Sequence, residues 1–172
     1  MNSTLRHETF SAPTAARRES GAVVKRVTTW LAALGGAFIL YIGLSYLIAP
    51  ESVVSGFGVP TWPVDEGTAF FAIKGVRDVA SGLVIFALLL TGQRKGLGWA
   101  MLALAFVPAG DMTIVLSNGG PAAAAFGIHG LTSALIATTG LLILRETGKA
   151  RKVPESAAVP EAVVPVPAAQ SV

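Results

Sequence analysis

The sequence has no cysteine and few charged residues. Without cysteine it can form no disulfide, no thiol redox centre and no thiolate metal site. Only 13% of its 172 residues are charged and 52% are hydrophobic, whereas a soluble domain carries roughly 25% charged residues. Most basic residues flank apolar runs and form no patch, which argues against a nucleic-acid partner. The composition therefore indicates a membrane protein whose first partner is the lipid bilayer.

Four long apolar runs determine the predicted fold class. Each approaches the roughly 20 residues that cross a bilayer as a helix, and a helix satisfies its own backbone hydrogen bonds there. About 26 mostly polar residues precede the first run, which we therefore interpret as a retained helix and not as a cleaved signal peptide. We expect an all-α, four-helix transmembrane bundle. Its spans lie at about 27–49, 69–91, 97–117 and 121–144.

The chain divides into three parts by composition. Residues 1–26 are polar without a period, and we expect a disordered tail there. Residues 27–146 form the four-span membrane domain. Residues 147–172 repeat Pro, Ala and Val, and prolines at that spacing block a helix, so we expect a second disordered tail.

The distribution of charge predicts the orientation of the bundle. Lys and Arg outside the runs fall in the two tails and in the second loop, while the first loop, 50–68, carries only acidic charges. With four spans all the basic segments lie on one side, which the positive-inside rule makes cytoplasmic. We therefore expect a multi-pass protein of the cell membrane with both termini in the cytoplasm.

Three charged residues interrupt the second run, "FFAIKGVRDVASGLVIFALLL" at 70–90. Each charge costs about 2.5–3.5 kcal/mol at the centre of a membrane helix, so we expect these residues to face the protein. Lys74, Asp78 and Ser81 follow the i, i+4, i+7 spacing and share a helix face with Arg77 at its side. Arg77 and Asp78 are sequence neighbours and should diverge. Glycines 75 and 82 should let another helix approach closely.

Counting residues back from the predicted hairpin turns places Asp111 level with Arg77 and Asp78, and His129 level with Asp111. Three spans would then carry ionisable groups at one depth, in the outer half of the membrane. We expect Asp111 to pair with Arg77, or with Lys74 instead. His129, whose ordinary pKa is about 6.5, would then be free to titrate. Thr132 shares the helix face of His129.

Four short motifs suggest a relationship. The run of "FGVP" (57–60), "KGVRD" (74–78), "PAGDM" (108–112) and "HGLT" (129–132) resembles a family of small four-span membrane proteins, the domain of unknown function 4267. The resemblance covers roughly residues 35–145. It implies a four-helix membrane domain and no activity. A fainter likeness, in helix number and size, is to DoxX-like proteins.

Three functions remain open for the charged cluster. In the first, the protein binds or transforms a small lipophilic molecule, with Asp111 and His129 as catalytic acid and base. The binding residues would be Lys74, Arg77, Asp78, Ser81 and Thr132. The neighbouring cations would compete with a metal for the carboxylates, so we predict no metal, and no motif indicates a cofactor. In the second, the protein is a small proton-coupled transporter. In the third, the cluster only locks the helix register. Whether the chain is an enzyme, and whether it forms homo-oligomers, stays open.

Overall fold

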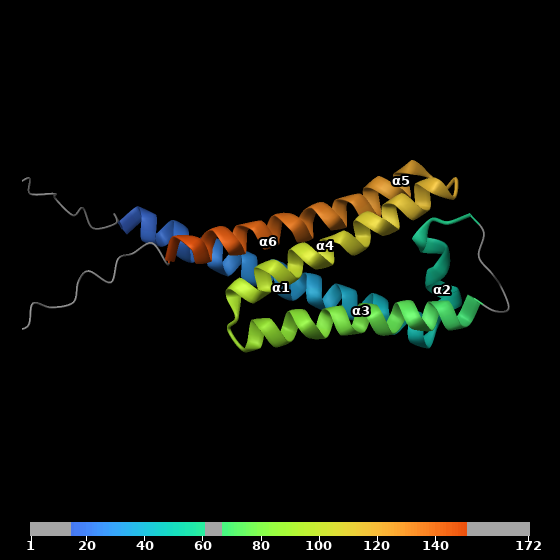
Figure 1. Ribbon diagram of the computed structural model, residues 1–172, viewed down its shortest axis with the longest axis horizontal. Helices are drawn as coiled ribbons and strands as arrows, with labels where there is room; N and C mark the ends of the chain where they lie inside the picture. Colours follow the sequence, from blue (N-terminus) through green and yellow to red (C-terminus); the bar gives the residue numbers. More distant parts are fainter. Residues whose placement is uncertain (1–14, 61–66, 151–172) are drawn as a thin grey trace, which may run out of the picture.

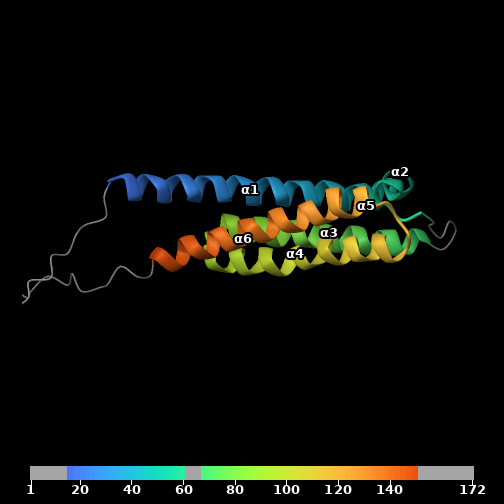
Figure 2. The same ribbon diagram turned by 90° about the horizontal axis from the view of Figure 1, so that it is seen from above.

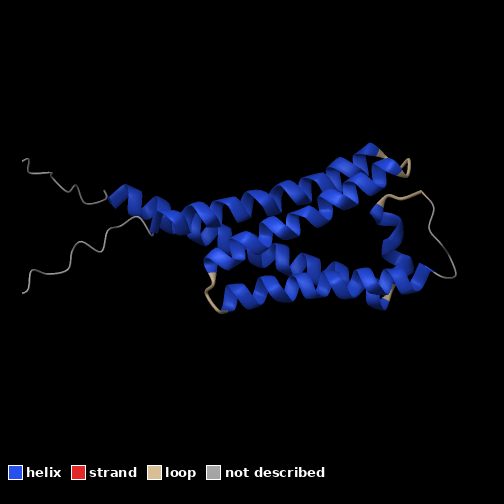
Figure 3. Ribbon diagram, viewed as in Figure 1, coloured by secondary structure: helices blue, strands red, loops and turns tan. Residues whose placement is uncertain are grey.

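The computed structural model describes residues 15–60 and 67–150, and within them the chain is helical except for short connections (Figure 3). The described parts contain no strand. Of the predicted disordered tails, 1–26 and 147–172, residues 1–14 and 151–172 lie outside the described residues, whereas residues 15–26 and 147–150 are helical. The helical elements are α1 (Ala15–Ile48), α2 (Pro50–Val54), η1 (Ser55–Phe57), α3 (Gly67–Leu90), α4 (Arg94–Ser117), α5 (Ala122–Ala124), η2 (Ala125–Gly130) and α6 (Leu131–Ala150).

Three helical segments are long and apolar enough, by length and composition, to cross a membrane: Glu19–Ile48, Arg94–Ser117 and Ala122–Gly148. Between short connections the described residues are all helical, and their long apolar helices are those of a membrane protein. Helix α3 matches α4 in length but carries three charged residues. Helix α1 begins at Ala15, twelve residues before the expected start of the first span. The added segment is rich in Ala, Arg, Glu and Lys, which are good helix formers.

The long helices associate as two pairs, α1 with α3 and α4 with α6 (Figure 1). Glycines allow the close approach in the first pair. A Cβ atom at Gly43 would lie 2.7 Å from the backbone nitrogen of Val79, and one at Gly75 would lie 2.8 Å from the carbonyl oxygen of Gly43. The predicted close approach at Gly75 and Gly82 is confirmed, since Gly82 packs equally tightly on Leu40.

In the second pair, α4 and α6 also approach closely through glycines, at one crossing. A Cβ atom at Gly98 would meet Leu144, and one at Gly140 would lie 2.9 Å from the carbonyl oxygen of Gly98. These helix glycines each serve their own pair, and the core between the pairs is built from Ala, Leu, Ile and Met side chains. Figure 2 shows α1 along one side of the molecule, with α6 between it and α4.

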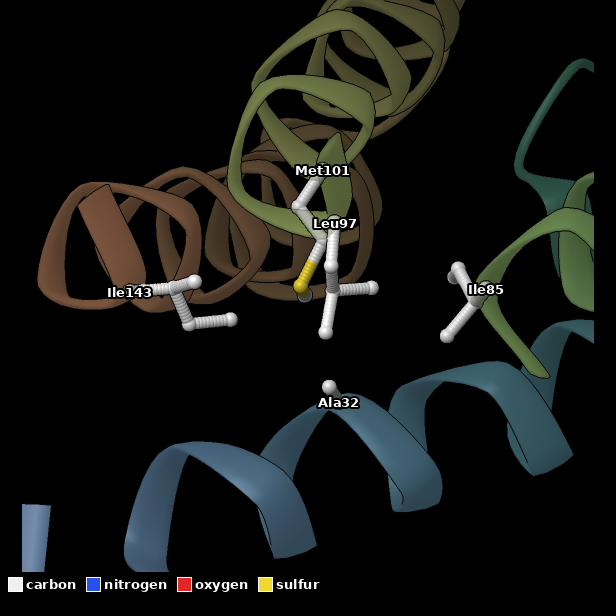
Figure 4. Packing of buried hydrophobic residues seen from close by; sticks show 5 residues of the cluster. All are labelled: Ala32, Ile85, Leu97, Met101 and Ile143. Carbon is white, nitrogen blue, oxygen red and sulfur yellow. The ribbon is translucent and has the colours of Figure 1, made fainter. Parts of the chain in front are cut away.

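The two pairs join near the end of the molecule where α1 begins and α6 finishes, which we call the terminal end. A core of buried apolar side chains draws on all four long helices there (Figure 4). Its members are Ala32, Ile85, Leu97, Met101 and Ile143. Leu97 and Ile143 are fully buried. This core fixes the crossing of the pairs.

At the opposite end, which we call the α2 end, residues 50–57 form a cap segment made of α2 and η1. Helix α1 stops at Ile48 because Pro50 has no N–H and its ring would clash with the carbonyl of the preceding turn. The cap segment then leads from α1 toward α4 (Figure 1). Phe57 anchors it there, buried against Val115 and Ala125.

Candidate functional site

A cavity of about 390 Å³ lies between the two helix pairs toward the α2 end. Its walls come from α1, α3, α4, η2 and α6, and the cap segment contributes Ser52, Val53, Ser55, Gly56 and Phe57. Ile85 and Met101 of the core close it toward the terminal end. Most of the wall is apolar. The polar and ionisable side chains that line it are Tyr41, Tyr46, Ser52, Ser55, Lys74, Asp78, Ser81, Asp111, His129 and Thr132.

A buried ion pair forms one side of the polar region. Lys74 Nζ lies 2.6 Å from Asp78 Oδ2, one turn along α3, and the Asp78 side chain is only 2% exposed. The ammonium also lies 5.0 Å from the centroid of the Tyr46 ring and 5.7 Å from that of Phe57. The carboxylate and two aromatic faces therefore stabilise the positive charge together.

His129 lies in the π-helical turn η2, a kind of turn frequently found at functional sites. Its Nε2 atom is 2.9 Å from the carbonyl oxygen of Phe57, and its ring centroid lies 4.7 Å from that of the Phe57 ring. A carbonyl only accepts, so Nε2 carries the proton and donates. In the neutral ring Nδ1 is then an acceptor. The contact ties η2 to the cap segment.

Asp111 lines the cavity from α4 and differs from Asp78 in its partners. Within residues 15–60 and 67–150 its carboxylate forms no ion pair and accepts no hydrogen bond. It nevertheless interacts electrostatically with Lys74, Arg77, Asp78 and His129. Lys74, Asp78, Asp111 and His129 line the same cavity, whereas their common depth in a membrane stays a prediction.

The hydroxyl groups near the cavity bond mostly to their own helices. Ser81 donates to the carbonyl of Arg77 at 2.9 Å, and Thr132 donates to the carbonyl of Ile128 at 2.6 Å. Ser133 instead donates across to Ala105 of α4 at 2.8 Å. Thus Ser81 and Thr132, two of the predicted binding residues, line the cavity, whereas Ser133 links α6 to α4.

The expected pairing of Asp111 is wrong. Lys74 pairs with Asp78, because the i, i+4 spacing brings them together without any contribution from another helix. Arg77 does not line the cavity. Its side chain is 54% exposed, and its Nε lies 3.9 Å from Asp78 Oδ1, so the two neighbours approach more closely than predicted. Arg77 thus leaves the predicted binding group, while the other predicted residues share one cavity.

Two aromatic residues of this site escaped the sequence reasoning. Tyr46 and Phe57 flank Lys74, and Phe57 also accepts the hydrogen bond from His129. The motif "FGVP" gave a weak signal for Phe57, since it stands in a loop otherwise rich in small residues. Nothing in the sequence places Tyr46 opposite Lys74, because that contact depends on the glycine-mediated register of α1 and α3.

A second polar cluster lies at the terminal end. Arg94 donates to Thr29 and Thr28 at 2.8 and 2.7 Å and to Glu146 at 2.6 Å, linking α4 to α1 and α6. The Arg94 and Glu146 side chains are 16% and 18% exposed. The sequence indicated Arg94 only as a topology signal. Its structural role could not be seen without the crossing of the helix pairs.

Comparison with known proteins identifies one family. The family described as Domain of unknown function (DUF4267) matches residues 36–143, which include every cavity-lining helix in part. This confirms the resemblance drawn from the four motifs. The fainter DoxX-like resemblance is not shown. No curated protein matches the chain. No solved structure matches it either.

Proposed function

Because the chain belongs to the family Domain of unknown function (DUF4267), which carries no activity to transfer, we propose a function from the site alone. The protein binds a small lipophilic molecule with a polar group in the cavity between its helix pairs. The observation that carries the proposal is the union of apolar walls with a few convergent polar groups in one cavity. Ligand sites in proteins have this character and volumes of roughly 300–1,000 Å³.

The amphipathic layout of the cavity supports an amphipathic ligand. The apolar residues Met101, Leu104 and Ile136 line the part near the core, while Asp111 and His129 belong to the polar group held near the cap segment. A ligand would therefore bind with its tail toward the terminal end and its polar group under the cap segment.

The route of entry follows from the exposed residues of the lining. Phe38, Tyr41 and Ile128 line the cavity and remain 53%, 64% and 48% exposed, respectively. They belong to α1 and η2, so the opening lies on the side of the bundle and faces lipid in the proposed topology. A lipophilic molecule would enter from the bilayer.

The ligand-binding function is favoured over an ionic lock and over transport. An ionic lock of helix register needs a pair between helices, whereas Lys74 and Asp78 both belong to α3. Transport needs a path past the core, where Leu97 is fully buried. An acid or base role for Asp111 and His129 remains part of this proposal as the enzymatic form of the same site.

The ligand proposal is tested by filling the cavity. Ile42 of α1 lines it, whereas Leu44, two residues along, is 47% exposed and does not. We expect native mass spectrometry of the protein extracted from its membrane to detect a bound small molecule. Ile42→Trp should lose that molecule and Leu44→Trp should keep it, with both variants folded. The same bound species in all three proteins would refute the cavity as its site.

We also propose four spans, with α3 crossing the membrane and both termini in the cytoplasm, so that the protein is multi-pass in the cell membrane. Helix α3 has 24 residues, as does α4, and its Lys74 and Asp78 side chains are largely buried. Arg77 can extend its charged head along the apolar surface toward the interface. Reporter fusions after residues 20, 60 and 150 test this topology. A cytoplasmic signal at 60, or an external one at 20 or 150, would contradict it.

A further inference from the structure

The polar groups of the cavity differ in whether they already have partners. Lys74 has its carboxylate and two aromatic faces. Ser81 and Thr132 donate to their own helices. Asp111 and the Nδ1 atom of His129 have no hydrogen-bond partner within the described residues. Both of these are acceptors when Asp111 is ionised and His129 is neutral.

Pro108 also lines the cavity, and because it has no N–H the carbonyl of Leu104 lacks the donor that an α-helix would supply. The hydroxyl groups of Tyr41, Tyr46 and Ser55 can donate or accept, and the strongest donor of the site, the Lys74 ammonium, is engaged. A ligand that complements Asp111 and His129 Nδ1 must itself supply donors.

The charges of the lining favour a cation over a neutral donor. Lys74 and Asp78 balance each other at 2.6 Å, and Arg77 lies outside the lining with an exposed side chain. Asp111 adds one negative charge without an ion-pair partner among the described residues. A carboxylate in an apolar cavity gains most from a counter-ion that also donates hydrogen bonds.

We infer that the ligand is a lipophilic amine whose protonated head binds Asp111, with His129 Nδ1 as a second acceptor. This inference rests on the proposed ligand-binding function and names its substrate class. The alkyl part of the amine would lie along the apolar wall toward Met101. Two sources offer this chemistry, a free lipophilic amine and the primary amine of a phospholipid headgroup.

Three eight-carbon probes with different heads test the inference: octylamine, octanol and octanoate. The full chain is placed in nanodiscs of phosphatidylcholine, and binding is measured as the increase in the thermal unfolding temperature. This temperature rises as the ligand occupies the native state. We expect octylamine to bind most tightly and octanoate to give no saturable stabilisation. Octanoate binding as tightly as octylamine would overturn the inference.

Asp111→Asn removes the charge and keeps the shape of the side chain. It should weaken octylamine binding by about ten- to a hundredfold, the range of a lost charge-assisted hydrogen bond. Glu51→Gln, which changes an exposed residue outside the cavity, is the charge-matched control and should bind octylamine as the wild type does. Octanol should bind Asp111→Asn about as well as it binds the wild type, which shows an intact cavity. Unchanged octylamine binding in Asp111→Asn would overturn the inference.

The remaining experiments distinguish a free amine from a lipid headgroup, and they distinguish failure of the amine inference from failure of the ligand-binding proposal. Weaker octylamine stabilisation in nanodiscs that also contain phosphatidylethanolamine would identify the lipid headgroup as the amine, and unchanged stabilisation would identify a free amine. Octanol or octanoate binding without preference for octylamine would refute the amine class and leave the ligand-binding cavity in place. No binding of any probe, together with no effect of Ile42→Trp on the co-purified molecule, would refute both. If Asp111→Asn fails to fold, the comparison of octylamine with octanoate in the wild type decides.

Discussion

Loss of the Arg94 guanidinium should loosen the junction of the two helix pairs. Arg94 holds Thr28 and Thr29 of α1 and Glu146 of α6 with hydrogen bonds of 2.6–2.8 Å. Arg94→Met keeps most of the aliphatic part of the side chain and removes the guanidinium group. With Glu146 only 18% exposed, we expect a loss of about 2–4 kcal/mol in the free energy of unfolding, somewhat below the 3–5 kcal/mol for breaking a fully buried pair.

A double-mutant cycle separates the pair from the desolvation of each partner. Glu146→Gln should lower the free energy of unfolding by about 1–3 kcal/mol, since Arg94 keeps its bonds to the threonines. The double variant should lose less than the sum of the single variants by about 1–3 kcal/mol. Unfolding in mixed micelles with increasing dodecyl sulfate measures all four proteins.

The neighbouring Lys95 provides the control. It is exposed and takes part in no ion pair among the described residues, so Lys95→Met should change stability by less than about 0.5 kcal/mol. Additivity of the Arg94 and Glu146 effects would refute the pairing. Equal losses in Lys95→Met and Arg94→Met would show that the positive charge near the helix start matters and the hydrogen bonds do not.

Two further variants test the packing and the cap segment. Gly43→Ala should lower the free energy of unfolding by about 1–3 kcal/mol, because its Cβ would lie 2.7 Å from the nitrogen of Val79, whereas Gly110→Ala meets nothing within 4 Å and should be neutral or stabilising in the same melt. Equal effects would contradict the close-approach argument. His129→Gln keeps a donor for the Phe57 carbonyl but lacks the Nδ1 acceptor of the ring, so it should fold like the wild type and bind octylamine more weakly. His129→Leu should in addition raise amide hydrogen exchange around residue 57, and wild-type octylamine binding by His129→Gln would show that the histidine is structural.

The features predictable from the sequence were those set by local geometry and by hydrophobic run length. The i, i+4 spacing of Lys74 and Asp78 places them on one face of any helix, and the structure pairs them at 2.6 Å. Counting back from the hairpin turns grouped Asp111 with His129 because the connection between α4 and α5 is short, with only residues 118–121 in it. Such calculations need no knowledge of how the helices cross.

The features that escaped depend on the crossing of helices and on irregular backbone. The Arg77–Asp111 pair failed because depth alone does not say which way a side chain points around its helix, and Arg77 points outward. Tyr46 meets Lys74 only in the register that the glycines impose on α1 and α3. The π-helical turn that carries His129 shifts the helical phase by one residue, and no sequence period signals it.

The placement of the glycines divides the molecule into two closely packed helix pairs that can rotate against each other. The closest helix contacts lie within α1–α3 and within α4–α6, the Arg94 cluster joins the two pairs at the terminal end, and the cap segment bridges them at the α2 end through Phe57. A helix of 20 residues is about 30 Å long, so a rotation of roughly 5° between the pairs at the terminal end would separate them by about 2.6 Å at the α2 end. Small changes of side-chain volume at the terminal end would thus be amplified in the width of the cavity. Substitutions far from the ligand would then change the size of ligand that the cavity accepts.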